Sequence, residues 1–205
     1  MNKSTILRAA VTLAAAAAAM FLVAQTRGVD QPADSSQAAR FDADGRLLQP
    51  EGYRQWFFVG AVVTPNDMNE PKAAFPEFHH VYIDPAGYEH FKTTGEFRDG
   101  TMLVKELASV GSKKASSGNG YFPGELQGLD VALKSKQHHP KEPGNWGYYT
   151  FGHAPPPYEK TAAVMATDKC ANCHKATAEI DMVFTQYYPV LTAERKLHQG
   201  QSKEK

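Results

Sequence analysis

Apolar and polar positions alternate over short runs in the middle of the chain, and turn-forming residues separate these runs. Runs with this spacing that are rich in aromatic and β-branched residues are typical of β-strands. The runs span residues 56–63, 79–83, 101–110, 126–133 and 146–151. Asp-Gly, Asn-Gly and Pro-Gly pairs lie between them at 99–100, 119–120 and 143–144, where tight turns use such residues. The pattern predicts antiparallel strands joined by hairpins.

Two other stretches indicate helices. Residues 85–94 begin with a proline and are followed by Gly95, as expected of a short helix. Apolar residues within 176–192 recur at helical spacing, which predicts a C-terminal helix that carries the Cys-X-X-Cys-His motif at 170–174. Many strands with few helices indicate an α+β domain that is mainly antiparallel sheet. A four-helix fold is excluded because three long helical stretches are missing upstream.

The N-terminus has the pattern of an export signal, since Lys3 and Arg8 precede an apolar run at 9–23 and Ala24 follows. A retained membrane anchor is the alternative, but a run of about 15 residues is shorter than the roughly 20 that a spanning helix needs. We expect a signal peptide at 1–25, a flexible leader at 26–45, one domain at 46–195 and a disordered tail at 196–205. The mature protein is then expected in the periplasm, without a membrane partner.

The charge of the chain is balanced, with 22 basic and 22 acidic residues. A protein without a basic field lacks the electrostatic attraction that nucleic acid binding needs. We therefore expect no nucleic acid partner.

The two cysteines carry the clearest chemical signal in the chain. Cys170 and Cys173 lie three residues apart, and His174 follows directly. Thiols one helical turn apart can add to the two vinyl groups of one porphyrin, and the adjacent imidazole then lies under the iron. The motif predicts one covalently bound haem c per chain, with His174 as the iron ligand.

Three other uses of these cysteines fit the motif less well. A disulfide is the usual state of two cysteines in an exported protein, but this spacing followed by a histidine is rare by chance. A structural zinc ion would need further ligands, and the chain has no second cysteine pair. A thioredoxin-like pair needs a βαβ context, which residues 161–169 do not offer.

The sixth coordination position of the iron has no clear protein ligand. Met182 is the only methionine after the motif, and we expect it in the same helix as His174, from which it cannot reach the opposite haem face. Candidates in principle are Met68, Met102, Met165, His79, His80, His138, His139 and His153. An open distal position is expected, and it favours small-ligand chemistry over simple electron transfer.

Several motifs together resemble the cytochrome P460 family, whose members are lysine-crosslinked c-haem hydroxylamine oxidases. They are GYRQW at 52–56, VYID at 81–84, GEFRDGT at 95–101, KEL at 105–107, GNGYF at 118–122 and CANCH at 170–174. The resemblance implies an antiparallel β fold, a homodimer, and oxidation of hydroxylamine to nitrous oxide or nitrogen oxides. An external acceptor, such as a soluble cytochrome c, would take the electrons. The alternatives are a β-sheet cytochrome c-prime that only binds nitric oxide, or an electron carrier.

In the resembled family a lysine nitrogen is bonded to a meso carbon of the porphyrin, and the match here is Lys105. On a strand, Leu103, Lys105 and Leu107 share one face, so the ammonium would point among apolar side chains. A buried lysine without a partner is costly, and a bond to the macrocycle would remove its charge. The alternative is that the face of Met102 and Val104 is the inner one and Lys105 is solvated.

A carboxylate beside the iron would help hydroxylamine oxidation, because protons leave together with electrons. Within residues 126–133, Asp130 lies on a face of small residues, while Leu129, Val131 and Leu133 form the packing face. The resemblance maps the pocket acid of the family onto Asp130, and the alternative is a solvent-facing aspartate. Candidate aromatic residues for the pocket wall are Phe75, Phe78 and Phe122.

Overall fold

The computed structural model describes residues 39–201, which form an α+β domain with a mainly antiparallel sheet, as predicted. The predicted signal peptide at 1–25 and the first part of the predicted leader lie outside the described residues. Within residues 39–201, no helix combines the length and the apolar character that crossing a membrane requires.

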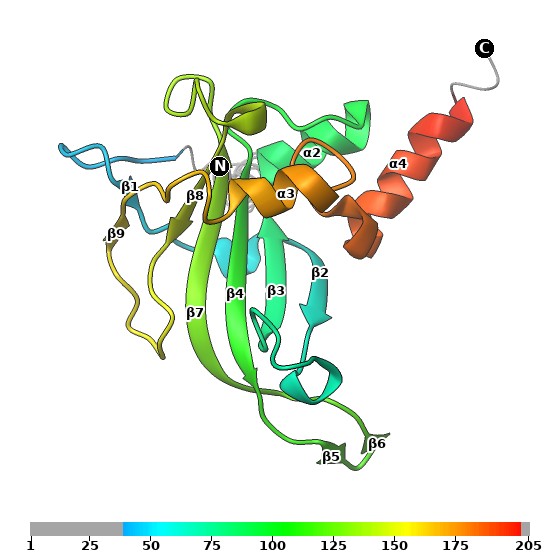
Figure 1. Ribbon diagram of the computed structural model, residues 1–205. Helices are drawn as coiled ribbons and strands as arrows, with labels where there is room; N and C mark the ends of the chain where they lie inside the picture. Colours follow the sequence, from blue (N-terminus) through cyan, green and yellow to red (C-terminus); the bar gives the residue numbers. More distant parts are fainter. Residues whose placement is uncertain (1–38, 202–205) are drawn as a thin grey trace, which may run out of the picture. The chain divides into compact units, whose positions relative to one another are not determined.

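Antiparallel strands in the order β2-β3-β4-β7-β8 form the central sheet (Figure 1). Their bounds are Phe57–Val63 for β2, Phe78–Ile83 for β3, Met102–Val110 for β4, Pro123–Lys134 for β7 and Trp146–Thr150 for β8. Each strand covers one of the runs predicted from the sequence. Two short pairs lie beside this sheet: β1 (Leu47–Leu48) with β9 (Thr161–Ala162), and β5 (Lys114–Ala115) with β6 (Gly118–Asn119).

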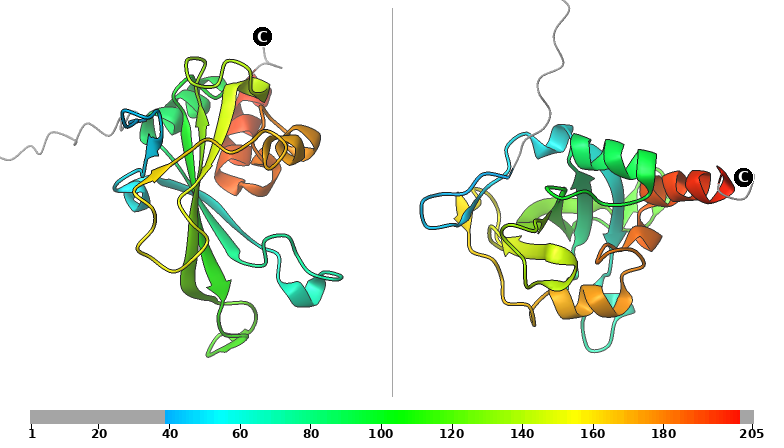
Figure 2. Two further views of the ribbon diagram at one scale, coloured as in Figure 1. Left: turned by 60° about the vertical axis from the view of Figure 1, so that its left-hand side comes forward. Right: turned by 90° about the horizontal axis from the view of Figure 1, so that it is seen from above.

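The helices are short and pack around the sheet. They are α2 (Pro85–Thr94), α3 (Ala171–Thr177) and α4 (Pro189–Gln201), with 3₁₀ turns η1 (Tyr53–Gln55), η2 (Asn66–Met68), η3 (Pro143–Asn145) and η4 (Thr185–Tyr187). Helix α3 crosses one face of the strands (Figure 1). Helices α2 and α4 lie side by side (Figure 2), where the Tyr88 hydroxyl donates to Glu194 Oε1 at 2.9 Å.

Helix α2 matches its predicted bounds because both of its ends are encoded locally. The Asp84 carboxylate accepts a hydrogen bond from Gly87 N at 2.8 Å, which caps the helix before Pro85. Its other oxygen accepts from Met102 N at 2.7 Å and so ties the cap to β4. Gly95 ends the helix with a left-handed φ of 75°, a conformation that glycine adopts without a steric penalty.

The predicted helix over 176–192 is wrong. Helix α3 ends at Thr177, and Asp181 and Met182 have positive φ values of 43° and 66°, which an α-helix cannot contain. Ile180 instead pairs with Val183 through backbone hydrogen bonds. A new helix, α4, begins at Pro189, so the Cys-X-X-Cys-His motif lies on α3 and not on the last helix.

Strand β4 has buried residues on both of its faces. Leu103 packs into a cluster with Val81 and Ile83 on the side of α2, α3 and α4. Val104 packs on the opposite side with Leu129, Val131, Leu133 and Tyr53. The packing face predicted for residues 126–133 is therefore confirmed, and the face of Lys105 is the one toward α3.

The domain extends at both ends beyond the limits expected from composition. Residues 40–45 belonged to the predicted leader, but Phe41 forms a bridge with Leu47 and packs against the core. At the other end, α4 continues through the first residues of the predicted tail to Gln201. The boundaries differ because they were predicted from mean composition. Composition does not register the apolar contact of Phe41 or the continuation of α4 into the predicted tail.

Candidate functional site

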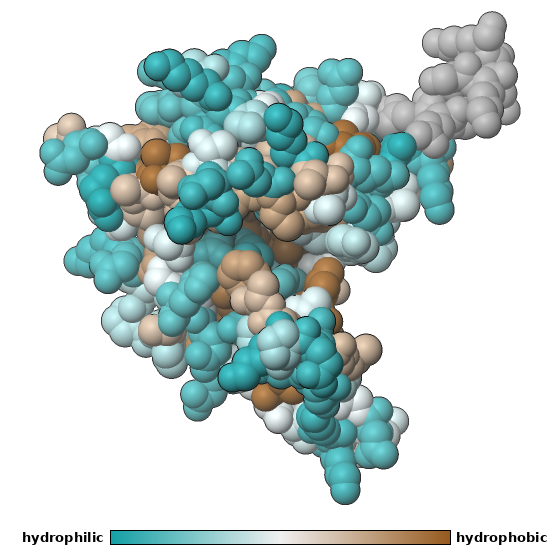
Figure 3. Space-filling view, in the orientation of Figure 1, coloured by the Kyte–Doolittle hydropathy of each residue, from teal (hydrophilic) through white to brown (hydrophobic). Residues whose placement is uncertain are grey.

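A cavity of about 250 Å³ lies between α3 and the central sheet. Its floor is made by the β4 and β7 face that includes Leu103, Lys105, Asp130 and Ala132, and its roof includes the motif on α3. Figure 3 shows the hollow below α3, with apolar residues at its bottom. The residues that the sequence assigned to haem attachment, iron binding, the crosslink and proton transfer line this one cavity: Lys105, Asp130, Cys170, Cys173 and His174.

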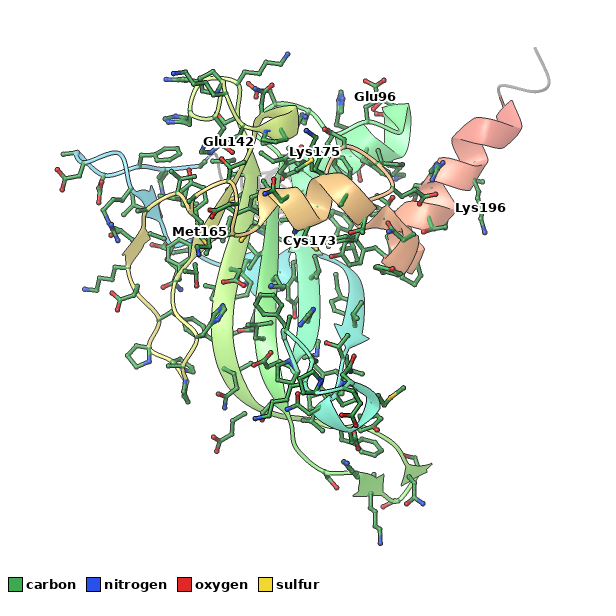
Figure 4. The ribbon with its side chains drawn as sticks, in the orientation of Figure 1. Glu96, Glu142, Met165, Cys173, Lys175 and Lys196 are labelled. Atoms are coloured by element: carbon green, nitrogen blue, oxygen red, sulfur yellow. The ribbon has the colours of Figure 1, made fainter. Side chains whose placement is uncertain are left out.

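The first turn of α3 presents the motif to the cavity. Cys170 is the residue before the helix, Cys173 lies inside it on the cavity side (Figure 4), and both thiols are free. Cys170 Sγ lies 3.7 Å from Met165 Sδ, which also lines the cavity. Both cysteines thus line the α3 side of one cavity.

His174 is held in one tautomer by the chain that follows α3. Its Nδ1 lies 2.7 Å from the carbonyl oxygen of Met182. A carbonyl only accepts hydrogen bonds, so Nδ1 carries the proton and Nε2 keeps its lone pair for a metal. Burial lowers the pKa of His174, which favours the neutral ring that a metal ligand needs. The rings of Tyr148 and Phe184 pack against the His174 ring, with centroid-to-centroid distances of 4.6 and 4.4 Å.

The expected place of Met182 needs a correction. It does not share a helix with His174, because the positive φ values end α3 before it. Its backbone carbonyl nevertheless bonds to His174, so Met182 lies on the histidine side of the cavity, as expected from the sequence.

Lys105 and Asp130 are direct partners across β4 and β7. Lys105 Nζ lies 3.0 Å from Asp130 Oδ2, with side chains that are 28% and 19% exposed. The same ammonium lies 4.6 Å from the ring centroid of Phe75, a distance that allows a cation–π contact. Phe75 is the cavity residue among the three aromatic candidates, whereas Phe78 and Phe122 lie outside the lining.

Asp130 has a second partner, His153, which the sequence named only as an iron ligand in principle. His153 Nε2 lies 3.1 and 3.3 Å from the two carboxylate oxygens. Burial raises the pKa of Asp130, but hydrogen bonds and the positive charges of His153 and Lys105 outweigh it and hold the pKa below its ordinary value. The bond to Asp130 raises the pKa of His153. The contact thus favours the ionised form of Asp130 and shifts His153 toward its protonated form.

His79 on β3 also lines the cavity and was named from the sequence only as a ligand in principle. Its Nε2 is buried and has no hydrogen-bond partner among the described residues. Burial, with the nearby charge of Lys105, lowers the pKa of His79 to about 4, so the ring is neutral at ordinary pH. Buried polar atoms almost always have partners, so a molecule inside the cavity is the expected partner of Nε2.

These features define a class of protein: an antiparallel sheet that faces a helix bearing the haem-attachment motif is the architecture of a β-sheet haem protein. The family model of cytochrome P460 matches residues 50–185, and the chain belongs to this family. Family membership implies haem binding, and the neutral, oriented His174 beside two free thiols fits that group. A comparison with curated proteins finds no significant match.

Proposed function

We propose that the protein is a periplasmic enzyme that oxidises hydroxylamine to nitrous oxide or nitrogen oxides. The haem would be bound covalently through Cys170 and Cys173, with His174 as its axial ligand. The observation that carries the proposal is the ion pair of Lys105 with Asp130, which lines the same cavity as the motif. A gas-binding or electron-transfer site does not need a carboxylate and a lysine in contact at this place.

When bound, the haem supplies an iron centre that takes electrons from hydroxylamine and passes them to an external acceptor, such as a soluble cytochrome c. Lys105 would hold the macrocycle by a bond to one of its meso carbons. That bond would remove the charge of Lys105 and release Asp130 from the ion pair. Asp130 would then be free to accept a proton.

Asp130 would serve as the proton acceptor of the reaction. Conversion of hydroxylamine to nitrous oxide and water releases as many protons as electrons, so a base near the substrate speeds each oxidation. The hydrogen bond from His153, which does not depend on the charge of Lys105, lowers the pKa of Asp130 and so favours the ionised carboxylate that accepts a proton. The ring of Phe75 lies beside the pair, with its centroid 4.6 Å from Lys105 Nζ, and lines the same cavity.

His79 would help to hold the substrate. His79 lines the cavity, and its Nε2 has no partner among the described residues, so the neutral imidazole could donate or accept one hydrogen bond with a molecule bound there. Hydroxylamine offers both an oxygen and an N–H group, so one such bond would orient it. Nitric oxide would be bound in the same space.

The test compares wild-type protein with Lys105→Ala and with Lys113→Ala as a matched control. Lys113 is also ion-paired, to Asp67, but lies away from the cavity. Protein from periplasmic expression is mixed with hydroxylamine and an artificial electron acceptor, and acceptor reduction is followed. Wild type and Lys113→Ala should turn over, and Lys105→Ala should lose turnover while it retains haem. A wild-type protein that binds nitric oxide but never reduces the acceptor would contradict the proposal and favour a gas-binding protein.

A further inference from the structure

We propose that His153 carries protons from Asp130 out of the cavity to bulk water. The inference rests on the proposed role of Asp130 and adds the next step, which hydroxylamine oxidation needs because a single carboxylate can hold only one proton. His153 would act through Asp130 and not on the substrate, so it is a proton-transfer residue behind the catalytic one.

The backbone places His153 beside Asp130 although the two lie far apart in the sequence. After β8 ends, Phe151 N donates to Leu129 O at 2.8 Å, and Leu129 N donates to Gly152 O at 3.2 Å. These bonds hold the segment against β7. Gly152 then turns the chain with a φ of 117°, a conformation that favours glycine.

Gly128 makes the space for the imidazole ring. A Cβ atom at this position would lie 3.1 Å from His153 Cδ2 and 2.9 Å from the Gly152 carbonyl oxygen. The absent side chain therefore lets the ring lie over β7 and reach both Asp130 oxygens, at 3.1 and 3.3 Å. On its other side the ring meets Phe75 edge-on, with centroids 6.1 Å apart.

The solvent exposure of the side chain increases from Asp130 to His153, which is the proposed direction of proton release. The Asp130 side chain is 19% exposed, whereas that of His153 is 48% exposed. The charged groups that face His153 are Asp130 on β7, Lys105 on β4 and Glu77 before β3. The hydrogen bond to Asp130 raises the pKa of His153, and the half-exposed ring is open to proton exchange with water.

The step is a proton transfer without any change in electron count. The O–H bond of protonated Asp130 breaks, and an N–H bond forms at Nε2 of neutral His153. The imidazolium then loses its Nδ1 proton to water, which leaves Asp130 as the carboxylate and His153 as a neutral ring with its proton on Nε2. Proton exchange between the half-exposed ring and water moves that proton back to Nδ1, so Nε2 can accept the next proton from Asp130. The rate of this exit rises with pH, because only the neutral ring accepts a proton.

Turnover of His153→Ala with hydroxylamine gives the first test. We expect kcat to fall about tenfold or more, with KM nearly unchanged, and imidazole added to the solution to restore it. Substituted imidazoles of different basicity should move the acid limb of the pH profile to follow their own pKa values. His90→Ala, on α2 and away from the cavity, is the control and should behave as wild type.

A second readout does not depend on activity. The rate of deuterium exchange at imidazole Cε1, followed by mass spectrometry across pH, gives the pKa of His153 in the holoprotein. Asp130→Asn should lower that pKa, whereas Asp67→Asn, at a distant ion pair, should not change it. An unchanged pKa in Asp130→Asn would overturn the inference, as would full turnover of His153→Ala. Absence of turnover in wild type would contradict the proposed function itself.

Discussion

The Tyr53 hydroxyl lies 2.5 Å from Glu106 Oε1, on the face of β4 opposite to Lys105. Glu106 is 3% exposed, and Arg54 also binds its carboxylate. The consecutive β4 residues Lys105 and Glu106 thus point to opposite faces of the sheet. The ammonium of Lys105 lies at the cavity, and the carboxylate of Glu106 lies on the other side. The Glu106 cluster, made of Tyr53, Arg54 and Glu106, fixes η1 to the sheet and takes no part in the cavity.

Breaking the Glu106 cluster should destabilise the fold without changing the haem site. Glu106→Ala leaves the Tyr53 hydroxyl buried without an acceptor, a loss of about 1–3 kcal/mol. Adding Tyr53→Phe to the Glu106→Ala variant should cost little more, because the hydrogen bond is already gone. Denaturant unfolding of both single variants and the double variant measures this coupling. Additive losses in the double variant would show that the two side chains do not interact.

Alkaline pH should act through the same tyrosine. Burial and the neighbouring carboxylate raise the pKa of Tyr53, so the folded state keeps the phenol protonated where the unfolded chain ionises. The contribution is complete below the unfolded value of about 10 and is lost as pH rises above it. Unfolding free energies of wild type and Tyr53→Phe between neutral and alkaline pH check this. Above that pH, the free energy of unfolding should fall more steeply with pH in wild type than in Tyr53→Phe.

The bond between Lys105 and the haem should be visible in peptides. Proteolysis should yield one haem joined to both the Cys173 peptide and the Lys105 peptide, with a pair of hydrogen atoms lost. Lys105→Ala should restore an ordinary c-haem visible spectrum, because nothing then perturbs the macrocycle. If the wild-type haem remains with the cysteine peptide alone, Lys105 is only an ion-pair partner of Asp130.

Asp130 should affect oxidation more than binding. A positioned general base contributes about 10²–10⁴-fold in rate, so Asp130→Ala should lower the oxidation rate of bound hydroxylamine within that range. Asp130→Glu should retain much of the rate. Stopped-flow spectra with an artificial oxidant separate binding from oxidation. Oxidation by Asp130→Ala at the wild-type rate would mean that water or another base takes the protons.

Replacement of His79 should change the vibrational frequency of a ligand bound to the haem. Loss of a hydrogen bond of about 1 kcal/mol in His79→Leu should shift the C–O stretch of the ferrous carbon monoxide complex and speed ligand release. His80→Leu is a suitable control, because His80 contacts Phe58 and Phe78 and does not line the cavity. An identical stretch in wild type and His79→Leu would place Nε2 away from the ligand.

The parts of the fold that local sequence controls agree with prediction, and the others do not. Alternation and turns predicted the strands, and the caps at Asp84 and Gly95 predicted α2. The apolar spacing of 176–192 gave a wrong helix because hydrophobic periodicity contains no information about the positive φ of Asp181. A tight loop can bury the same residues as a helix face.

Some residues of the site could likewise be predicted from the sequence, and others could not. Cys170, Cys173 and His174 are adjacent, so their spacing alone suggested the chemistry. His153 has no periodic pattern, and its contact with Asp130 depends on a glycine turn after β8 and on the missing side chain of Gly128. Among the described residues, no group forms a hydrogen bond with His79 Nε2, and this depends on the tertiary structure around it. No pattern along the chain contains such information.

The carbonyl that holds His174 belongs to a loop outside the haem helix, and this loop is tied to the sheet. Lys134 Nζ, on β7, lies 2.7 Å from Asp181 Oδ2, next to Met182. With His174 as the axial ligand, a stronger or weaker bond from Nδ1 to the carbonyl would change the electron donation of the imidazole to iron. Substitutions in this loop would therefore shift the reduction potential of the protein without contact with its cofactor.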